Sequence, residues 1–254
     1  MPENIRQYHN LILSFVAEGD DHRVWMPENS LDISGDVTLQ DNREVIFNFN
    51  GGEVRQYGDL AIAGDVLLQG GAEWRIQSNG VHQLTVLGNW TQAGNWTVFA
   101  AEGGQVHDLY LHGSLVNNGL LQAQTGIRFH FLGSQPATVT GAPFGTSGSE
   151  ETTFRQILVD KGNGSSVTFN DPKLALEPLT WTDNPSPHAV SLENGFAHFL
   201  QAKQTSLLLS DAAELYAIPA NGGLSLQNID ALFAQAVVYL LGDLRLTNQS
   251  LKIG

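Results

Sequence analysis

Short apolar runs that alternate with polar residues recur along most of the chain. The apolar positions follow a period of two, and each run is about four to seven residues long, which is typical of half-buried β-strands. Such runs lie at Leu31–Ile33, Val37–Leu39, Val45–Phe49, Leu60–Ile62, Val66–Leu68, Leu84–Val86, Trp96–Val98, Leu109–Leu111 and Ile127–Phe131, and more follow between Val190 and Ile253. The pattern predicts an all-β protein.

A glycine followed by a small polar residue separates many of these runs. The pairs are Gly35-Asp36, Gly64-Asp65, Gly88-Asn89, Gly113-Ser114, Gly133-Ser134 and Gly242-Asp243. The first five of these glycines are spaced by 29, 24, 25 and 20 residues. Three short strands with three turns need about 20 to 30 residues, so the intervals predict a parallel β-helix (β-solenoid) with about 20–29 residues per coil and loop insertions. An antiparallel β-sandwich is the alternative, because short, regularly spaced strands also describe that fold.

The repeat indicates a single β-solenoid domain over residues 1–254. A segment rich in Gly, Ser and Thr near 142–153 and a proline-rich segment near 171–188 interrupt the pattern, and we expect irregular loops there. Residues 229–241 are apolar enough to form a buried helix capped by Asn228. We expect the solenoid to continue through them, because Gly242-Asp243 follows this segment as similar pairs follow the earlier strands.

The small polar residue after each glycine is expected to serve the scaffold. Asp36, Asp65, Asn89 and Ser114 occupy the same position of the repeat, and they differ in charge. Short Asp and Asn side chains accept hydrogen bonds from nearby backbone amides at turns. We therefore expect these residues to mark corners of the solenoid, where they bond local backbone amides.

The composition excludes several classes of partner. The chain has 12 Lys and Arg against 26 Asp and Glu, which gives a formal net charge of −14. Nucleic acid is disfavoured, because phosphate binding requires clustered cations. No segment approaches the roughly 18 consecutive apolar residues of a transmembrane helix, so we expect no membrane insertion. The chain has no cysteine, which excludes disulfides and thiolate metal sites.

Residues 84–169 resemble the β-solenoid segments of large secreted or cell-surface proteins of the Bacteroidetes type. The matching strings are G-N-W-T-Q-A-G-N-W-T (88–97), G-S-L-V-N-N-G-L-L (113–121), F-L-G-S-Q-P-A-T-V-T-G (131–141) and F-R-Q-I-L-V-D-K-G-N-G-S-S-V-T-F (154–169). The resemblance implies a right-handed parallel β-helix that serves as stalk, spacer or adhesin. It also implies an extracellular or cell-surface location, with neighbouring domains and the signal or anchor outside this sequence.

A duplicated G-N-W-T string supplies the candidate ligand-binding residues, Asn89, Trp90, Asn95 and Trp96. Exposed tryptophan rings stack on sugars, and the neighbouring asparagines can donate and accept hydrogen bonds, so a glycan or another cell-surface ligand is the partner that these residues indicate. The alternative is that both rings belong to the core.

No metal site and no catalytic residue is assigned. Ca²⁺ stays an alternative because carboxylates are abundant, with Asp20-Asp21, Glu150-Glu151 and the corner aspartates as candidates, but no calcium-loop motif is present. We expect the eight histidines to be solvated or stacked in ladders rather than to bind a metal.

The sequence predicts a non-enzymatic structural or adhesive β-solenoid module of a bacterial surface or secreted protein, which acts as a stalk and a polar binding surface. The alternative is a carbohydrate-binding or polysaccharide-cleaving parallel β-helix. An enzyme is disfavoured because the 12 cations are scattered along the sequence, whereas a polysaccharide lyase or hydrolase requires acidic and basic side chains that converge on one face.

Overall fold

The fold is taken from a computed structural model of the chain. It describes residues 7–15, 23–41, 53–94, 97–102, 104–123, 126–142, 152–162, 164–175, 180–181, 189–203, 206–209, 215–233, 237–248 and 251–253. The chain divides into two compact units, Met1–Ile127 and Arg128–Gly254, and each is described by itself. The interpretation of residues 1–254 as one domain stays a prediction.

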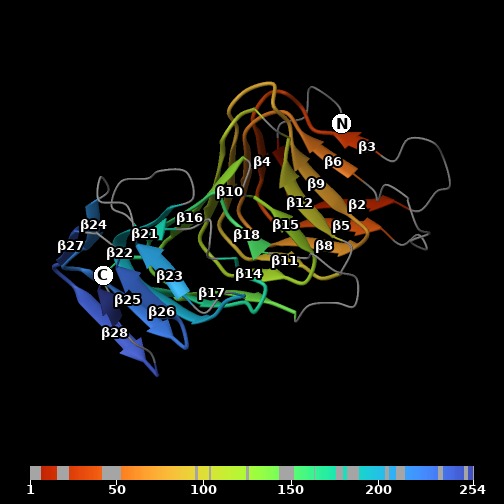
Figure 1. Ribbon diagram of the computed structural model, residues 1–254. Coiled ribbons are helices and arrows are strands. Elements are labelled where there is room, and N and C mark those ends of the chain that lie inside the picture. Colours follow the sequence, from red (N-terminus) through yellow and green to blue (C-terminus); the bar gives the residue numbers. More distant parts are fainter. Residues whose placement is uncertain are drawn as a thin grey trace. The chain divides into compact units, whose positions relative to one another are not determined.

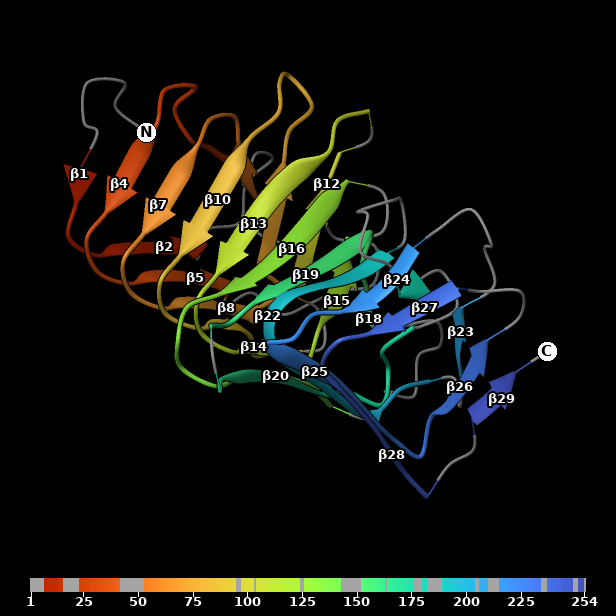
Figure 2. The same cartoon turned by 90° about the vertical axis from the view of Figure 1, so that its left-hand side faces the viewer.

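The first unit consists of three parallel sheets, which we call its first, second and third walls (Figures 1 and 2). The first wall contains β1 (Gln7–Tyr8), β4 (Leu31–Ile33), β7 (Leu60–Ile62), β10 (Gln83–Val86) and β13 (His107–Leu111). The second wall contains β2 (Leu11–Phe15), β5 (Val37–Asp41), β8 (Val66–Gly70), β11 (Trp90–Gln92) and β14 (Leu115–Asn117). The third wall contains β3 (Arg23–Trp25), β6 (Glu53–Gln56), β9 (Glu73–Ile76), β12 (Val98–Ala101) and β15 (Leu120–Gln122).

Each coil of the first unit contributes one strand to each wall, so equivalent residues of successive coils lie in register. Apolar residues with period two consequently form buried columns, since alternate side chains of a strand point to the same side of the sheet. One column of the first wall is Ile33, Ile62, Val86 and Leu111, and one column of the third wall includes Val54, Trp74, Phe99 and Leu121. No coil can bury its apolar side chains alone, so stacking on neighbours stabilises every coil.

The second unit is also built from parallel strands, and phenylalanine side chains are prominent in its core. In one sheet, β16 (Ile127–Leu132) pairs with β19 (Gln156–Asp160); β16 begins at the last residue of the first unit. In another sheet, β17 (Ala137–Gly141) pairs with β20 (Ser166–Asn170). The long strand β22 (Ala189–Gln201) pairs with both β19 and β20. The remaining strands are β18 (Thr152–Thr153), β21 (Thr180–Trp181), β23 (Ser206–Leu209), β24 (Leu215–Ile218), β25 (Gly222–Gln227), β26 (Asp230–Phe233), β27 (Val237–Leu240), β28 (Asp243–Thr247) and β29 (Leu251–Ile253). Phe169 stacks on Phe199 at 4.5 Å between ring centroids and meets Phe131 edge-on at 5.7 Å.

The structure confirms the predicted all-β parallel β-solenoid. The β-sandwich alternative is wrong, because every strand pairing given for the described residues is parallel. The helix alternative for 229–241 is also wrong, since β26 and β27 occupy this segment. In the expected loop near 142–153, residues 143–151 lie outside the described residues, and Thr152–Thr153 form a strand. In the expected loop near 171–188, residues 176–179 and 182–188 lie outside the described residues, and Thr180–Trp181 form a strand. Within the described part of the chain, no helix has the length and apolar character that a membrane span requires.

Candidate functional site

The small polar residues after the corner glycines, together with Asn10 of the first coil, form a continuous hydrogen-bonded row along the first unit. The backbone amide of Asp65 donates to Oδ1 of Asp36 at 2.8 Å, and the amide of Asn89 donates to Oδ1 of Asp65 at 2.7 Å. The same bond joins Asp36 to Asn10 at 2.9 Å and Ser114 to Asn89 at 2.9 Å. We call these five residues the Asx ladder.

The prediction for these residues is correct about the kind of hydrogen bond and wrong about the partner, which is not a local amide. The side chains of Asn10, Asp36, Asp65 and Asn89 each accept from a backbone amide, as predicted, but the amide belongs to the next coil. The partners are 24 to 29 residues apart in sequence, as for Asp65 with Asn89 and Asp36 with Asp65. A turn within one coil cannot supply such a bond, so the ladder joins coils and contributes to their stacking.

The glycines that precede the Asx ladder are required by close approach between coils. The amide of Gly88 donates to the carbonyl of Gly64 at 3.1 Å, and the amide of Gly113 donates to Gly88 at 3.0 Å. A Cβ atom on Gly88 would lie 2.3 Å from Oδ1 of Asp65 and 2.5 Å from the carbonyl oxygen of Gly64. Any side chain at this position would therefore push the coils apart.

Trp90 is a core residue, which overturns the expectation that its ring stacks on a sugar. Its side chain is 0% exposed and packs between Trp74, at 5.3 Å between ring centroids, and Phe99, at 4.4 Å. Period two shows which residues share a face of a strand, but it does not show which face points inward. The neighbouring candidate Asn89 belongs to the Asx ladder, and Asn95 and Trp96 lie outside the described residues, so their assignment stays a prediction.

Two histidines of the first unit form a buried stacked pair. The rings of His82 and His107 are 5.5 Å apart and nearly parallel, and Nδ1 of His107 accepts a hydrogen bond from the backbone amide of His82 at 3.1 Å. Burial, with a smaller contribution from the nearby His82, lowers the pKa of His107 to about 4 against the opposing charge of Asp108. Burial also lowers the pKa of His82 from its ordinary value of 6.5, so both rings are neutral at pH 7. The stacked pair agrees with the expectation of ladder-stacked histidines.

The second unit contains two buried lysines next to turns. Lys161 is 0% exposed, and its Nζ donates to the backbone carbonyl of Leu132 at 2.7 Å. Desolvation lowers the pKa of this amine to about 8. Lys173 is also buried, and its backbone amide donates to Oδ1 of Asp171 at 2.8 Å. Burial raises the pKa of the Asp171 carboxyl group.

Three arginines and two glutamates gather on the outer side of the third wall. In register, Arg23 lies beside Glu53 and Glu53 beside Glu73, while Arg55 lies beside Arg75. We call this group, together with Trp25, the arginine face; its members are Arg23, Trp25, Glu53, Arg55, Glu73 and Arg75. It brings together three of the chain's 12 cations, so the interpretation of the cations as scattered is wrong for this wall.

Glu53 is the centre of the arginine face. It receives the Nε groups of Arg23 and Arg55, each at 3.0 Å, and the Nε of Arg75 lies 3.6 Å away. Arg75 also binds Glu73 at 2.9 Å. Desolvation lowers the pKa of Arg55, but the hydrogen bond and charge of Glu53 outweigh it and the net direction is upward. The guanidinium group of Arg55 is therefore charged, and its ion pair with Glu53 orients it.

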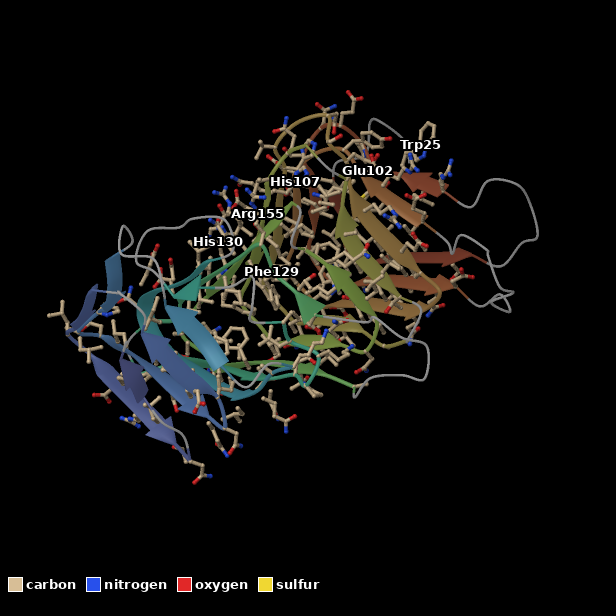
Figure 3. The ribbon with its side chains drawn as sticks, viewed as in Figure 1. Trp25, Glu102, His107, Phe129, His130 and Arg155 are labelled. Carbon is tan, nitrogen blue, oxygen red and sulfur yellow. The ribbon has the colours of Figure 1, made fainter. Side chains whose placement is uncertain are left out.

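Trp25 extends the arginine face at its first coil. Its side chain is 57% exposed and projects outward from β3 (Figure 3). In register, Trp25 lies beside Arg55, which lies beside Arg75. The signal in the sequence was the pattern of R-V-W at 23–25, E-V-R at 53–55 and E-W-R at 73–75, in which charged or aromatic residues flank one apolar residue.

Comparison of the chain with protein-family models, with curated proteins and with solved structures finds no match. Among the described residues, no group of three or more His, Asp or Glu side chains is placed to hold a metal ion. Of the calcium candidates, Asp20-Asp21 and Glu150-Glu151 lie outside the described residues.

Proposed function

We propose that this chain is a non-enzymatic scaffold module of a secreted or cell-surface bacterial protein, which supplies length and a binding wall. The observation that carries the proposal is the Asx ladder. Its carboxylate and amide groups are those that acid–base or metal chemistry would need, and the Oδ1 atom of each accepts a hydrogen bond from the backbone of the next coil. The side chains of the corner thus serve to hold coils together.

The core supports the same proposal. Backbone hydrogen bonds between coils are continuous through the walls of the first unit, and the aromatic cluster of Trp74, Trp90 and Phe99 fills its interior. Stacked coils whose backbone groups are paired on both sides resist extension, because many bonds must break together. The extracellular location is proposed from the resemblance of residues 84–169 to surface-protein solenoids.

Single-molecule extension of the chain between two marker domains tests the mechanical role. We expect the unfolding force to fall in the Asp65→Ala variant, which removes the acceptor for the Asn89 amide, and to be retained in Asp65→Asn, which keeps Oδ1. Equal forces in the wild type and Asp65→Ala would contradict a load-carrying ladder. Release of reducing ends or unsaturated products from acidic polysaccharides would contradict the non-enzymatic proposal.

Protease treatment of intact cells of the source bacterium tests the location. A chain displayed at the surface is degraded while a cytoplasmic marker survives, and a secreted chain is recovered from the medium. A chain found only inside cells and protected from the protease would contradict the surface assignment.

A further inference from the structure

The arginine face combines two features that point to a ligand. It presents ion-paired guanidinium groups on the surface of a chain whose net charge is −14, and it presents an exposed indole ring in the same row. Arg23, Arg55 and Arg75 carry three positive charges, and Glu53, Glu73 and the nearby Glu102 carry three negative charges, so the charges of the face balance within a chain that is strongly acidic as a whole. A purely structural ion-pair cluster would explain why the glutamates lie beside the arginines, but it would not explain why Trp25 is exposed.

The spacing of the row follows from the β-solenoid. Trp25, Arg55 and Arg75 occupy equivalent positions of successive coils, and adjacent parallel strands are about 4.8 Å apart. A linear ligand that runs along the solenoid axis would therefore meet the indole first and one guanidinium at each following step. This step is comparable in length to one pyranose ring.

The guanidinium groups are oriented by ion pairs and have N–H donors that could bind the carboxylate of a ligand. A guanidinium has five N–H donors, and the Nε atoms of Arg23 and Arg55 are oriented by Glu53. The side chains of Arg55 and Arg75 are 23% and 32% exposed, so parts of both guanidinium groups face solvent. Planar guanidinium groups bind carboxylates through two parallel hydrogen bonds, which favours a planar carboxylate as ligand.

We propose that the arginine face binds a carboxylate-bearing oligosaccharide, with Trp25 stacked on one sugar ring and Arg55 and Arg75 bound to the carboxylates of the sugars that follow. Aromatic rings bind the apolar faces of sugar rings, which explains the indole. A nucleic acid fits less well, because affinity for a phosphate backbone grows with the number of cations and this face has three within a strongly acidic chain. The proposal adds a ligand to the scaffold function and does not depend on it.

Calorimetric titration of the full chain with tetragalacturonate, and with maltotetraose as the neutral counterpart, tests the inference. We expect saturable binding of the acidic oligosaccharide alone, weakened by added NaCl. Trp25→Ala and Arg75→Gln should each raise Kd by at least about tenfold, since each removes one of the proposed contacts. Arg245→Gln is the matched control: it removes an exposed arginine of the second unit, whose side chain is 63% exposed, and should leave Kd unchanged.

The outcomes separate ligand binding from a structural role. Circular dichroism and the melting temperature establish that each variant is folded, and Arg75→Lys, which keeps the charge but loses the planar fork, should bind with intermediate affinity. Binding that survives Trp25→Ala and Arg75→Gln, or no binding of tetragalacturonate by the wild type, would overturn the proposal. Equal binding of maltotetraose would overturn the carboxylate assignment. A failure here leaves the mechanical test at Asp65 unaffected, so the two proposals fail separately.

Discussion

Gly88 in the first unit and Gly162 in the second are required for different physical reasons. Gly88 in the first unit does not have a positive φ, yet a Cβ atom there would lie 2.5 Å from the carbonyl oxygen of Gly64 in the neighbouring coil. Gly162 in the second unit has a φ of 71° and no atom within 4 Å of its Cβ position. The first glycine is needed because two backbones approach closely, and the second because the chain turns through the left-handed region.

This comparison shows what a glycine in a solenoid sequence means. Glycines that are followed by an Asx residue in successive coils mark a contact between coils, and every side chain should be harmful there. Isolated glycines at turns such as Gly162 mark a local conformation, which asparagine adopts at low cost. Substitutions that distinguish these two causes test the comparison directly.

Gly88→Ala is expected to have the largest effect. The added methyl group would overlap two oxygen atoms of the preceding coil, one of which belongs to the backbone and cannot rotate away. We expect a loss of roughly 3 kcal/mol or more in the free energy of unfolding, measured by urea denaturation. Gly80→Ala is the control, because its Cβ would meet only His82, at 3.4 Å, and it should change stability by less than about 0.5 kcal/mol. Similar stabilities for the two variants would refute the close-approach argument.

The first unit should lose stability in acid through His107. Its folded pKa is lowered from 6.5 to about 4, so the unfolded state binds more protons between these values. The contribution is therefore fully present above pH 6.5 and is lost as the pH falls to about 4, by about 3 kcal/mol in total. His107→Asn keeps an acceptor for the His82 amide and removes the titration. Urea denaturation at pH 4.5 and 7 should show a smaller pH dependence for this variant than for the exposed-site control His9→Asn.

The second unit should respond to pH in a different window, through Lys161. Its folded pKa is lowered from 10.5 to about 8, so the unfolded state binds more protons between these values. The contribution is complete above pH 10.5 and is lost as the pH falls to about 8, again by about 3 kcal/mol. Lys161→Met should remove most of this dependence, whereas Lys203→Met, at an exposed position, should retain it. An unchanged slope in Lys161→Met would show that another group titrates.

The Asx ladder should tolerate asparagine and reject alanine. Asp65→Ala leaves the amide of Asn89 without its acceptor, and we expect a loss of about 1–2 kcal/mol. Asp65→Asn keeps Oδ1, and the chain itself has asparagine at the equivalent position 89, so this variant should stay within about 0.5 kcal/mol of the wild type. Equal losses in both variants would show that the charge of Asp65, and not its oxygen, carries the effect.

Much of the fold could be predicted from the sequence because the β-solenoid repeats its own pattern. Period two located the strands, and the intervals between Gly35, Gly64, Gly88 and Gly113 gave the length of the coil. The same reasoning could not place Trp90 inside, because alternation divides a strand into two faces without naming the buried one. Only the contacts with Trp74 and Phe99 settle that choice.

The arginine face could not be predicted by the same pattern. Arg23 and Glu53 are 30 residues apart, whereas Glu53 and Glu73 are separated by 73 − 53 = 20, since the connections between coils differ in length. Without the register of the third wall, R-V-W, E-V-R and E-W-R are three unrelated strings. The corner glycines mark the first and second walls, and they fix no register for the third.

Gly162→Ala is expected to have the smallest effect and completes the comparison with Gly88. Its φ of 71° lies in the left-handed region, and no atom lies within 4 Å of its Cβ position, so only the backbone conformation opposes a side chain. We expect a loss of about 1 kcal/mol for alanine, and less than about 0.5 kcal/mol for Gly162→Asn, because asparagine visits this region readily. Urea denaturation of both variants beside Gly88→Asn supplies the contrast: asparagine should rescue position 162 and fail at position 88. If asparagine is as harmful as alanine at 162, the space around this glycine is occupied and the distinction between Gly88 and Gly162 is lost.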